Sequence, residues 1–210
     1  MDLGTAAASA WSAGISLYGV IAAVGIAGRL RWIEANPFFE RPEVIGIALV
    51  LFVVEFVVDK IAFLDSLWDL IHTFLRPLGG AMIGALAPHQ QLPMPVAIAL
   101  GATLSLSAHA AKSTTRMVVN ASPEPASNVV VSALEDGFVA AFMALAFAYP
   151  KVAGVIALIL GVVSVVFSIV MFRTARRAWR SVRARWRRWR GRQERPPPDP
   201  AGGAWPTVPS

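Results

Sequence analysis

The chain has 210 residues, of which 56% are hydrophobic and 15% are charged, and its mean hydropathy is +0.58. A soluble domain carries about 25% charged residues, so this composition indicates an integral membrane protein. There is no cysteine, which excludes disulfides, thiol catalysis and cysteine metal sites.

The N-terminal residues Met1 to Gly4 lack the basic region of a signal peptide, so we expect the first apolar stretch to stay in the protein. A hydrocarbon core about 30 Å thick needs roughly 20 apolar residues in a helix. In chain order, the stretches that we predict to span the membrane are 6–28, 43–58, 94–111, 129–148 and 152–172.

Residues 63–87 admit two arrangements. Their second half, from Pro77, is apolar and has Gly80 and Gly84 at GxxxG spacing, whereas the first half carries four ionisable residues. The two halves form either one span that is kinked near Pro77, or a polar helix followed by a re-entrant segment. The fold class is therefore an all-α transmembrane bundle, with six spans or with five spans and a re-entrant segment.

Basic residues are concentrated after the last span. Eleven arginines lie between Arg173 and Arg195, and with Glu194 and Asp199 they give this end a net charge of +9, which leaves −3 of the chain's +6 for the body. We expect three parts: a transmembrane bundle (1–172), a basic juxtamembrane segment (173–195) and a disordered Pro- and Gly-rich tail (196–210).

The orientation follows from the same asymmetry. The positive-inside rule places the basic segment, and so the C-terminus, in the cytoplasm of a multi-pass cell-membrane protein. With six spans the N-terminus is cytoplasmic too. With five it lies outside, and Arg29, Arg31 and Arg41 fall inside, as the rule prefers.

The basic segment also has an expected partner. Tryptophans interleaved with arginines directly after a span are typical of contact with anionic lipid head groups, and we prefer this partner to nucleic acid. The residues expected at the lipid surface are Arg173, Arg176, Arg177, Arg180, Trp179, Trp186 and Trp189.

Polar residues within the predicted spans recur at helical spacing, so that each set lies on one face of its helix. The four sets are Glu55 and Asp59; Asp65, Asp69, His72 and Arg76; Ser105, His109, Lys112 and Arg116; and Asn128, Ser132 and Glu135. In a six-span bundle the four helix ends that carry them meet on the cytoplasmic side. Because buried charges need partners, this convergence favours six spans.

Ionisable groups inside a membrane are costly and usually functional, so these faces define a candidate binding or transport cluster. Its expected members are Glu55, Asp59, Lys60, Asp65, Asp69, His72, Arg76, His109, Lys112, Arg116, Asn120, Glu124, Asn128, Glu135 and Asp136. Acids outnumber fixed bases, so a cation or protons would complete the charge, with His72 and His109 as proton relays.

Several functions stay open at this point. The first is a small cation- or proton-coupled transporter; the alternative is a scaffold or assembly protein whose cluster is a structural ion-pair network. Asp65, Asp69 and His72 share a face and would suit a metal, but a helix start also favours acids, so the metal is unknown.

No motif of a hydrolase, nucleotide-binding enzyme or zinc protease is present, so we favour a non-enzyme and expect no cofactor, although a lipid head-group enzyme remains open. The sequence does not indicate an oligomeric state.

Two long polar signatures carry a resemblance. The first reads EFVVDK at 55–60, DSLWD at 65–69, HTFLRP at 72–77 and GA at 80–81. The second reads HAAK at 109–112, Arg116, NASPEP at 120–125, SN at 127–128 and ED at 135–136. In order and spacing the chain resembles a family of bacterial membrane proteins known only as a domain of unknown function, over about residues 5–150. The resemblance implies a multi-span membrane fold and no activity.

Overall fold

A computed structural model describes residues 1–87, 92–120 and 125–193. Within the helices, the side chains of residues 62, 120, 125–128, 175, 178, 179 and 181–193 are not described. The helices are α1 (Leu3–Ala13), α2 (Leu17–Arg29), α3 (Pro42–Val58), α4 (Ala62–Leu86), α5 (Met94–Asn120), α6 (Pro125–Ala148) and α7 (Pro150–Gln193). The described ranges contain no strand, so the predicted all-α class is confirmed.

In the part of the chain that the structure describes, three helices are long and apolar enough to cross a membrane: Met94–Val119, Val129–Ala148 and Pro150–Thr174. They contain the predicted spans at 94–111, 129–148 and 152–172, and they indicate a membrane protein. The count of six spans is not confirmed, because the other described helices are too short or too polar. The chain divides into two units, Met1–Met171 and Phe172–Ser210, and all the tertiary contacts discussed below lie within the first.

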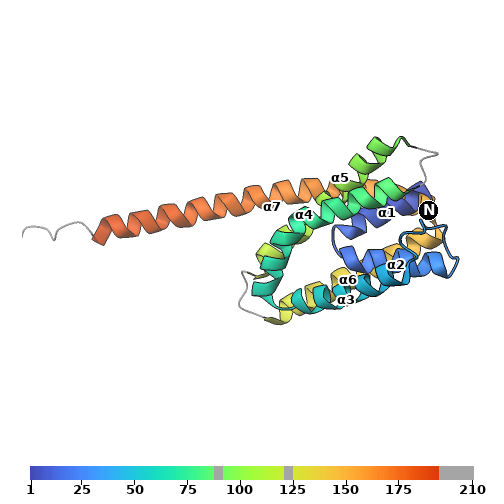
Figure 1. Cartoon of the computed structure of the whole chain (residues 1–210). Helices are drawn as coiled ribbons and strands as arrows, with labels where there is room; N and C mark the ends of the chain where they lie inside the picture. The colour runs from blue at the N-terminus through green and yellow to red at the C-terminus, as the bar shows by residue number, and fades with distance from the viewer. Residues whose placement is uncertain (88–91, 121–124, 194–210) are drawn as a thin grey trace, which may run out of the picture. The chain divides into compact units, whose positions relative to one another are not determined.

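The predicted continuous span at 6–28 is wrong. The chain breaks at Gly14–Ser16, and the short helices α1 and α2 run antiparallel as a hairpin (Figure 1). The 11 residues of α1 measure about 16 Å, roughly half of a hydrocarbon core. Gly14 allows the turn to touch α5, because a Cβ at this position would lie 2.1 Å from the carbonyl oxygen of Ser105. Because residues 6–28 are apolar throughout, their hydropathy does not reveal the break.

Helix α4 is continuous through Pro77, so residues 63–87 form one helix and no break separates a polar helix from the segment at 77–87. The helix changes direction along its length (Figure 1), as a proline inside a helix leads us to expect. Its second half packs closely on α5, since a Cβ on Gly80 would lie 2.4 Å from the carbonyl oxygen of Gly101. Two adjacent helices thus make backbone contact through glycine.

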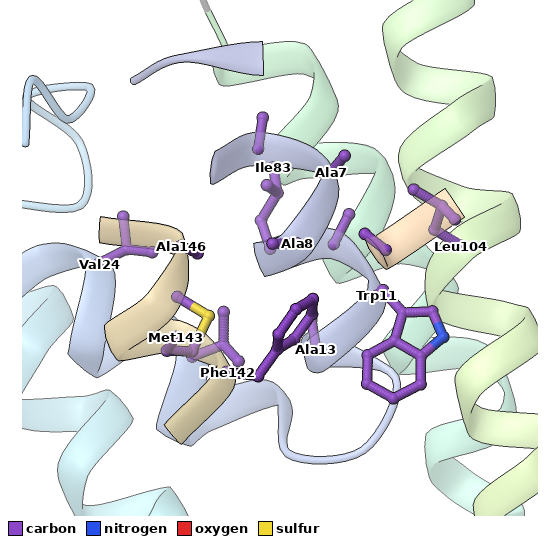
Figure 2. Close-up of a cluster of buried hydrophobic side chains, with 14 of the residues drawn as sticks. Ala7, Ala8, Trp11, Ala13, Val24, Ile83, Leu104, Phe142, Met143 and Ala146 are labelled. Carbon is purple, nitrogen blue, oxygen red and sulfur yellow. The ribbon is translucent and has the colours of Figure 1, made fainter. Parts of the chain in front are cut away.

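The hairpin is buried in the core of the first unit. Figure 2 shows Trp11 of α1 beside Phe142 of α6, and their ring centroids are 5.8 Å apart in an edge-to-face arrangement. Alanines such as Ala8 and Ala13 are fully buried and let neighbouring helices approach. The Trp11 indole donates a hydrogen bond of 3.3 Å to the hydroxyl of Ser164 on α7. Two short helices are therefore held on several sides.

Candidate functional site

The ends of four long helices and the turn of the hairpin meet in one buried charged network. It joins the end of α3, the start of α4, the end of α5 and the start of α6, as the spacing of polar residues predicted. Its most deeply buried ionisable members are Glu55, Asp59, Asp65, Asp69, His72, Arg76, His109, Lys112 and Arg116. Among these residues four carboxylates face three fixed bases, so the described network is short of positive charge.

Arg76 on α4 is completely buried and connects three elements. Its Nη2 donates to Glu55 of α3 at 2.9 Å, and its Nη1 lies 3.3 Å from Asp69, about two turns earlier on α4. Nη1 also donates to the Gly14 carbonyl at 3.2 Å. Ser16, just past the turn, donates to the second carboxylate oxygen of Glu55 at 3.2 Å. The guanidinium therefore fixes the hairpin turn to α3 and α4.

The hydrogen bonds of His109 define its tautomer. Arg76 Nη1 lies 2.9 Å from His109 Nδ1, and because a guanidinium only donates, Nδ1 must accept. The proton then resides on Nε2, which donates to the Thr73 hydroxyl at 3.0 Å, while Thr73 donates to the Asp69 backbone carbonyl. A second proton can reach this ring only if Arg76 moves away from Nδ1.

Lys112 on α5 forms a second node at the same turn. Its Nζ pairs with Asp59 at the end of α3 and donates to the Ile15 carbonyl at 3.0 Å. One turn further along α5, Arg116 donates to Glu135 of α6 at 2.7 Å and to the Asp59 backbone carbonyl at 2.9 Å. Two consecutive carbonyls of the hairpin turn, Gly14 and Ile15, thus bind two different basic side chains.

His72 is buried but lies at the edge of the network. Its Nδ1 is 2.8 Å from the Trp68 carbonyl, which can only accept, so this nitrogen carries the proton. Its Nε2 then accepts from the Tyr18 hydroxyl at 3.3 Å. The two described histidines hold opposite tautomers, and neither is paired directly with a carboxylate among the described residues.

The remaining predicted members are placed less centrally. Lys60 Nζ lies 3.0 Å from the centroid of the Phe56 ring and donates to the Phe56 carbonyl, in the loop after α3. Burial lowers the pKa of Lys60 from its ordinary value, although the charges of Asp136 and Asp59 act the other way. Asp136 itself is half-buried. Asn120, Glu124 and Asn128 have side chains outside the described residues.

A polar pocket opens onto the network between α4 and α5. It has a volume of about 290 Å³ and is lined by Ser66, Asp69, Leu70, Thr73, Ser113, Arg116 and Met117. Ser113 donates to Asp69 at 3.0 Å, so the second carboxylate oxygen of Asp69 faces this side. The pocket gives a small polar species a way to an ion-paired carboxylate.

The suggested metal site at Asp65, Asp69 and His72 finds no support in the geometry. Across the described ranges, no three His, Asp or Glu side chains are arranged to hold a metal ion. His72 instead uses both ring nitrogens for Trp68 and Tyr18.

Sequence reasoning missed the hairpin turn and several hydroxyls. Gly14, Ile15 and Ser16 lie in an uncharged stretch, and backbone carbonyls leave no sequence signal. Thr73 and Ser113 were detectable, because each follows a predicted site residue by one helical turn. In the basic segment, Arg173, Arg176, Arg177 and Arg180 are exposed, whereas Trp179, Trp186 and Trp189 lie outside the described side chains.

Fold and site together define an all-α protein with apolar, membrane-compatible helices around a buried charged network. The chain belongs to the family described as domain of unknown function DUF4126, which matches residues 3–170. The resemblance inferred from the two polar signatures is thereby confirmed. Comparison with curated proteins gave no significant match. Comparison with solved structures gave none either.

Proposed function

We propose that this protein is a small cation- or proton-coupled membrane transporter whose site is the network at the hairpin turn. The observation that carries the proposal is that two basic side chains each bind a backbone carbonyl at the helix break and also pair with carboxylates. Gly14 and Ile15 present carbonyls to Arg76 and Lys112, which also pair with Glu55, Asp69 and Asp59. Broken helices with such carbonyls at membrane depth are typical of coupling-ion sites in transporters.

Lys112 is the group that an incoming cation would replace. Its ammonium is a point charge on a flexible stem, whereas the planar Arg76 guanidinium is fixed by several acceptors. A cation that reaches Asp59 would take over the carboxylate and the Ile15 carbonyl, and the lysine would swing away. A proton on Asp59 would break the same pair. Exchange of the ammonium for a proton or for a monovalent cation keeps the buried charge constant, whereas a divalent cation would add one positive charge, which the network's excess of carboxylates can accept.

The membrane arrangement that goes with this proposal has five crossing helices, α3 to α7, and a re-entrant α1–α2 hairpin. Helix α1 is too short to cross, and its turn ends at the network. The basic segment (173–195), most of which belongs to α7, places that end in the cytoplasm. The N-terminus and the α2–α3 loop then lie outside. The basic segment binds anionic lipid head groups, as expected from its sequence.

A second candidate is a scaffold whose network serves only to hold the broken helix. The observation in its favour is that Arg76, Lys112 and Arg116 each pair with at least one described carboxylate. Removing one member of a buried pair destabilises by about 3–5 kcal/mol, whereas replacing both members can be neutral. The two candidates therefore differ in flux: a scaffold has none even in the wild type, whereas a transporter should lose its flux when a charged pair is replaced by a neutral pair that still folds.

The test uses Asp59→Asn, the double variant Asp59→Asn/Lys112→Gln and the exposed control Glu43→Gln in proteoliposomes that contain a pH-sensitive dye. Flux is driven by a proton gradient against Na⁺, K⁺ or Ca²⁺, and thermal stability is measured alongside. We expect flux in the wild type and the control, a destabilised single variant, and a folded double variant without flux. A wild type with no flux above empty liposomes for any of these ions would reject transport, and a folded double variant with full flux would reject this site.

A further inference from the structure

An apolar groove lies along α2 and begins at Ser16, which donates to Glu55 of the charged network. It has a volume of about 580 Å³ and is lined by α2, α3, α6 and Trp32. Ligand pockets typically measure about 300–1,000 Å³, so the groove is large enough for a substantial apolar group. Small residues such as Gly19 and Ala144 line it together with Phe52, and Ser16 is the one hydroxyl-bearing residue among its described lining. An apolar hollow of this size in a membrane protein must be filled by apolar matter.

One end of the groove leads to positive charge. A second hollow, of about 400 Å³, shares Ile26 and Leu49 with the groove and reaches Arg29. Among the described residues, Arg29 is the only charged one that lines either hollow. Arg29 and the exposed Arg31 make no ion pair with any carboxylate among the described residues. The mouth of the groove therefore carries the guanidinium of Arg29, which donates to the Glu40 backbone carbonyl at 3.3 Å and has no carboxylate partner among the described residues.

Arg31 occupies a backbone position that ordinarily favours glycine. Its φ is 60°, and it follows the C-terminus of α2, where the Trp32 amide donates to the Ala27 carbonyl at 2.9 Å and the Arg31 amide to the Gly28 carbonyl. A strained residue that persists at such a position is a pointer to function. Trp32 beside it is 67% exposed, as tryptophans at a membrane–water interface are.

We propose that this groove binds one acyl chain of an anionic phospholipid, whose phosphate lies at Arg29 and Arg31. The apolar lining matches an acyl chain, and the exposed Trp32 matches the membrane interface. Arg29 at one end, with Arg31 two residues further along the chain, matches the phosphate of the head group. A second copy of the chain fits less well, because a symmetric contact over this mouth would bring like-charged arginines together. The lipid site shares Ser16 with the proposed transport site, but lipid binding does not depend on transport.

The test uses the purified full-length chain in nanodiscs with a phospholipid that carries a diazirine at the end of one acyl chain. Phosphatidylglycerol and phosphatidylcholine probes are compared, and cross-linked peptides are mapped by mass spectrometry. We expect cross-links on α2, α3 and α6. Ala144→Trp, and the milder Ala140→Leu, fill the groove and should lower them, whereas Val162→Trp, at a position of α7 that is 66% exposed, should not.

Replacing Arg29 or Arg31 by Gln should reduce the preference for phosphatidylglycerol by about fivefold for each arginine. Thermal stability of each variant shows that it is folded. Equal cross-linking of α7 and the groove, no response to either groove-filling variant, or dimer cross-links in place of lipid cross-links would overturn the proposal. If the groove-filling variants lose their cross-links but the arginine variants keep the wild-type preference for phosphatidylglycerol, the role of the arginines would be overturned.

Discussion

At the residue scale, hydrogen-bond direction determines what the two buried histidines can do. Arg76 only donates, so His109 accepts through Nδ1; the Trp68 carbonyl only accepts, so His72 donates through Nδ1. The sequence predicted that both histidines lie at the site, because their spacing places them on polar helix faces. It did not predict their tautomers, which depend on partners 33 residues away or on a carbonyl. The role of proton relay stays a prediction.

We predict that the tautomers are observable by NMR. The chain has three histidines, so ¹⁵N-histidine spectra in detergent micelles should resolve each ring, with His72→Gln and His109→Gln as assignments. His109 should show a protonated Nε2 and a bare Nδ1, and His72 the reverse. A doubly protonated His109 at neutral pH would contradict the hydrogen bond from Arg76.

At the element scale, the break between α1 and α2 decides the architecture. The turn touches α5 through Gly14, and its carbonyls bind Arg76 and Lys112. An uncharged apolar stretch of this length reads as one span, because hydropathy does not distinguish a straight helix from a hairpin of two short ones. What makes the hairpin favourable is the set of partners that other helices supply for its free carbonyls.

We predict that Gly14→Ala destabilises the protein by about 1–3 kcal/mol, as overpacking usually does. A Cβ at Gly14 meets backbone at 2.1 Å and would displace the turn from both basic side chains. The matched control is Gly46→Ala on α3, where nothing lies within 4 Å of the added Cβ. The control should be stabilising by up to about 1 kcal/mol through helix propensity. Apparent melting temperatures in detergent measure both, and equal melting temperatures would contradict the close packing.

At the scale of the whole molecule, topology separates three arrangements of the chain. The re-entrant hairpin places both the N-terminus and the α2–α3 loop outside. Six spans place only the loop outside, and the five-span arrangement first considered places only the N-terminus there. The network lies at the same end of the bundle in the first two, so its geometry alone does not distinguish them.

Because the native chain has no cysteine, single-cysteine labelling can settle the topology. We predict that Asp2→Cys and Glu34→Cys both react with a membrane-impermeant maleimide in intact cells. Ser210→Cys in the basic C-terminal part should react only after permeabilisation. Protection of Asp2→Cys with labelling of Glu34→Cys would instead establish six spans.

Composition and periodicity by themselves indicated the membrane class, the all-α fold and most of the charged cluster, whereas the family followed from the resemblance of the two polar signatures. Those properties depend on local hydropathy and on the 3.6-residue period, which a single sequence displays. Only the tertiary structure decided that residues 6–28 fold back at Gly14, that Arg76 and Lys112 bind the turn, and that His109 accepts from Arg76. These features depend on backbone carbonyls and on contacts between distant helices, and no side-chain pattern along the chain records them.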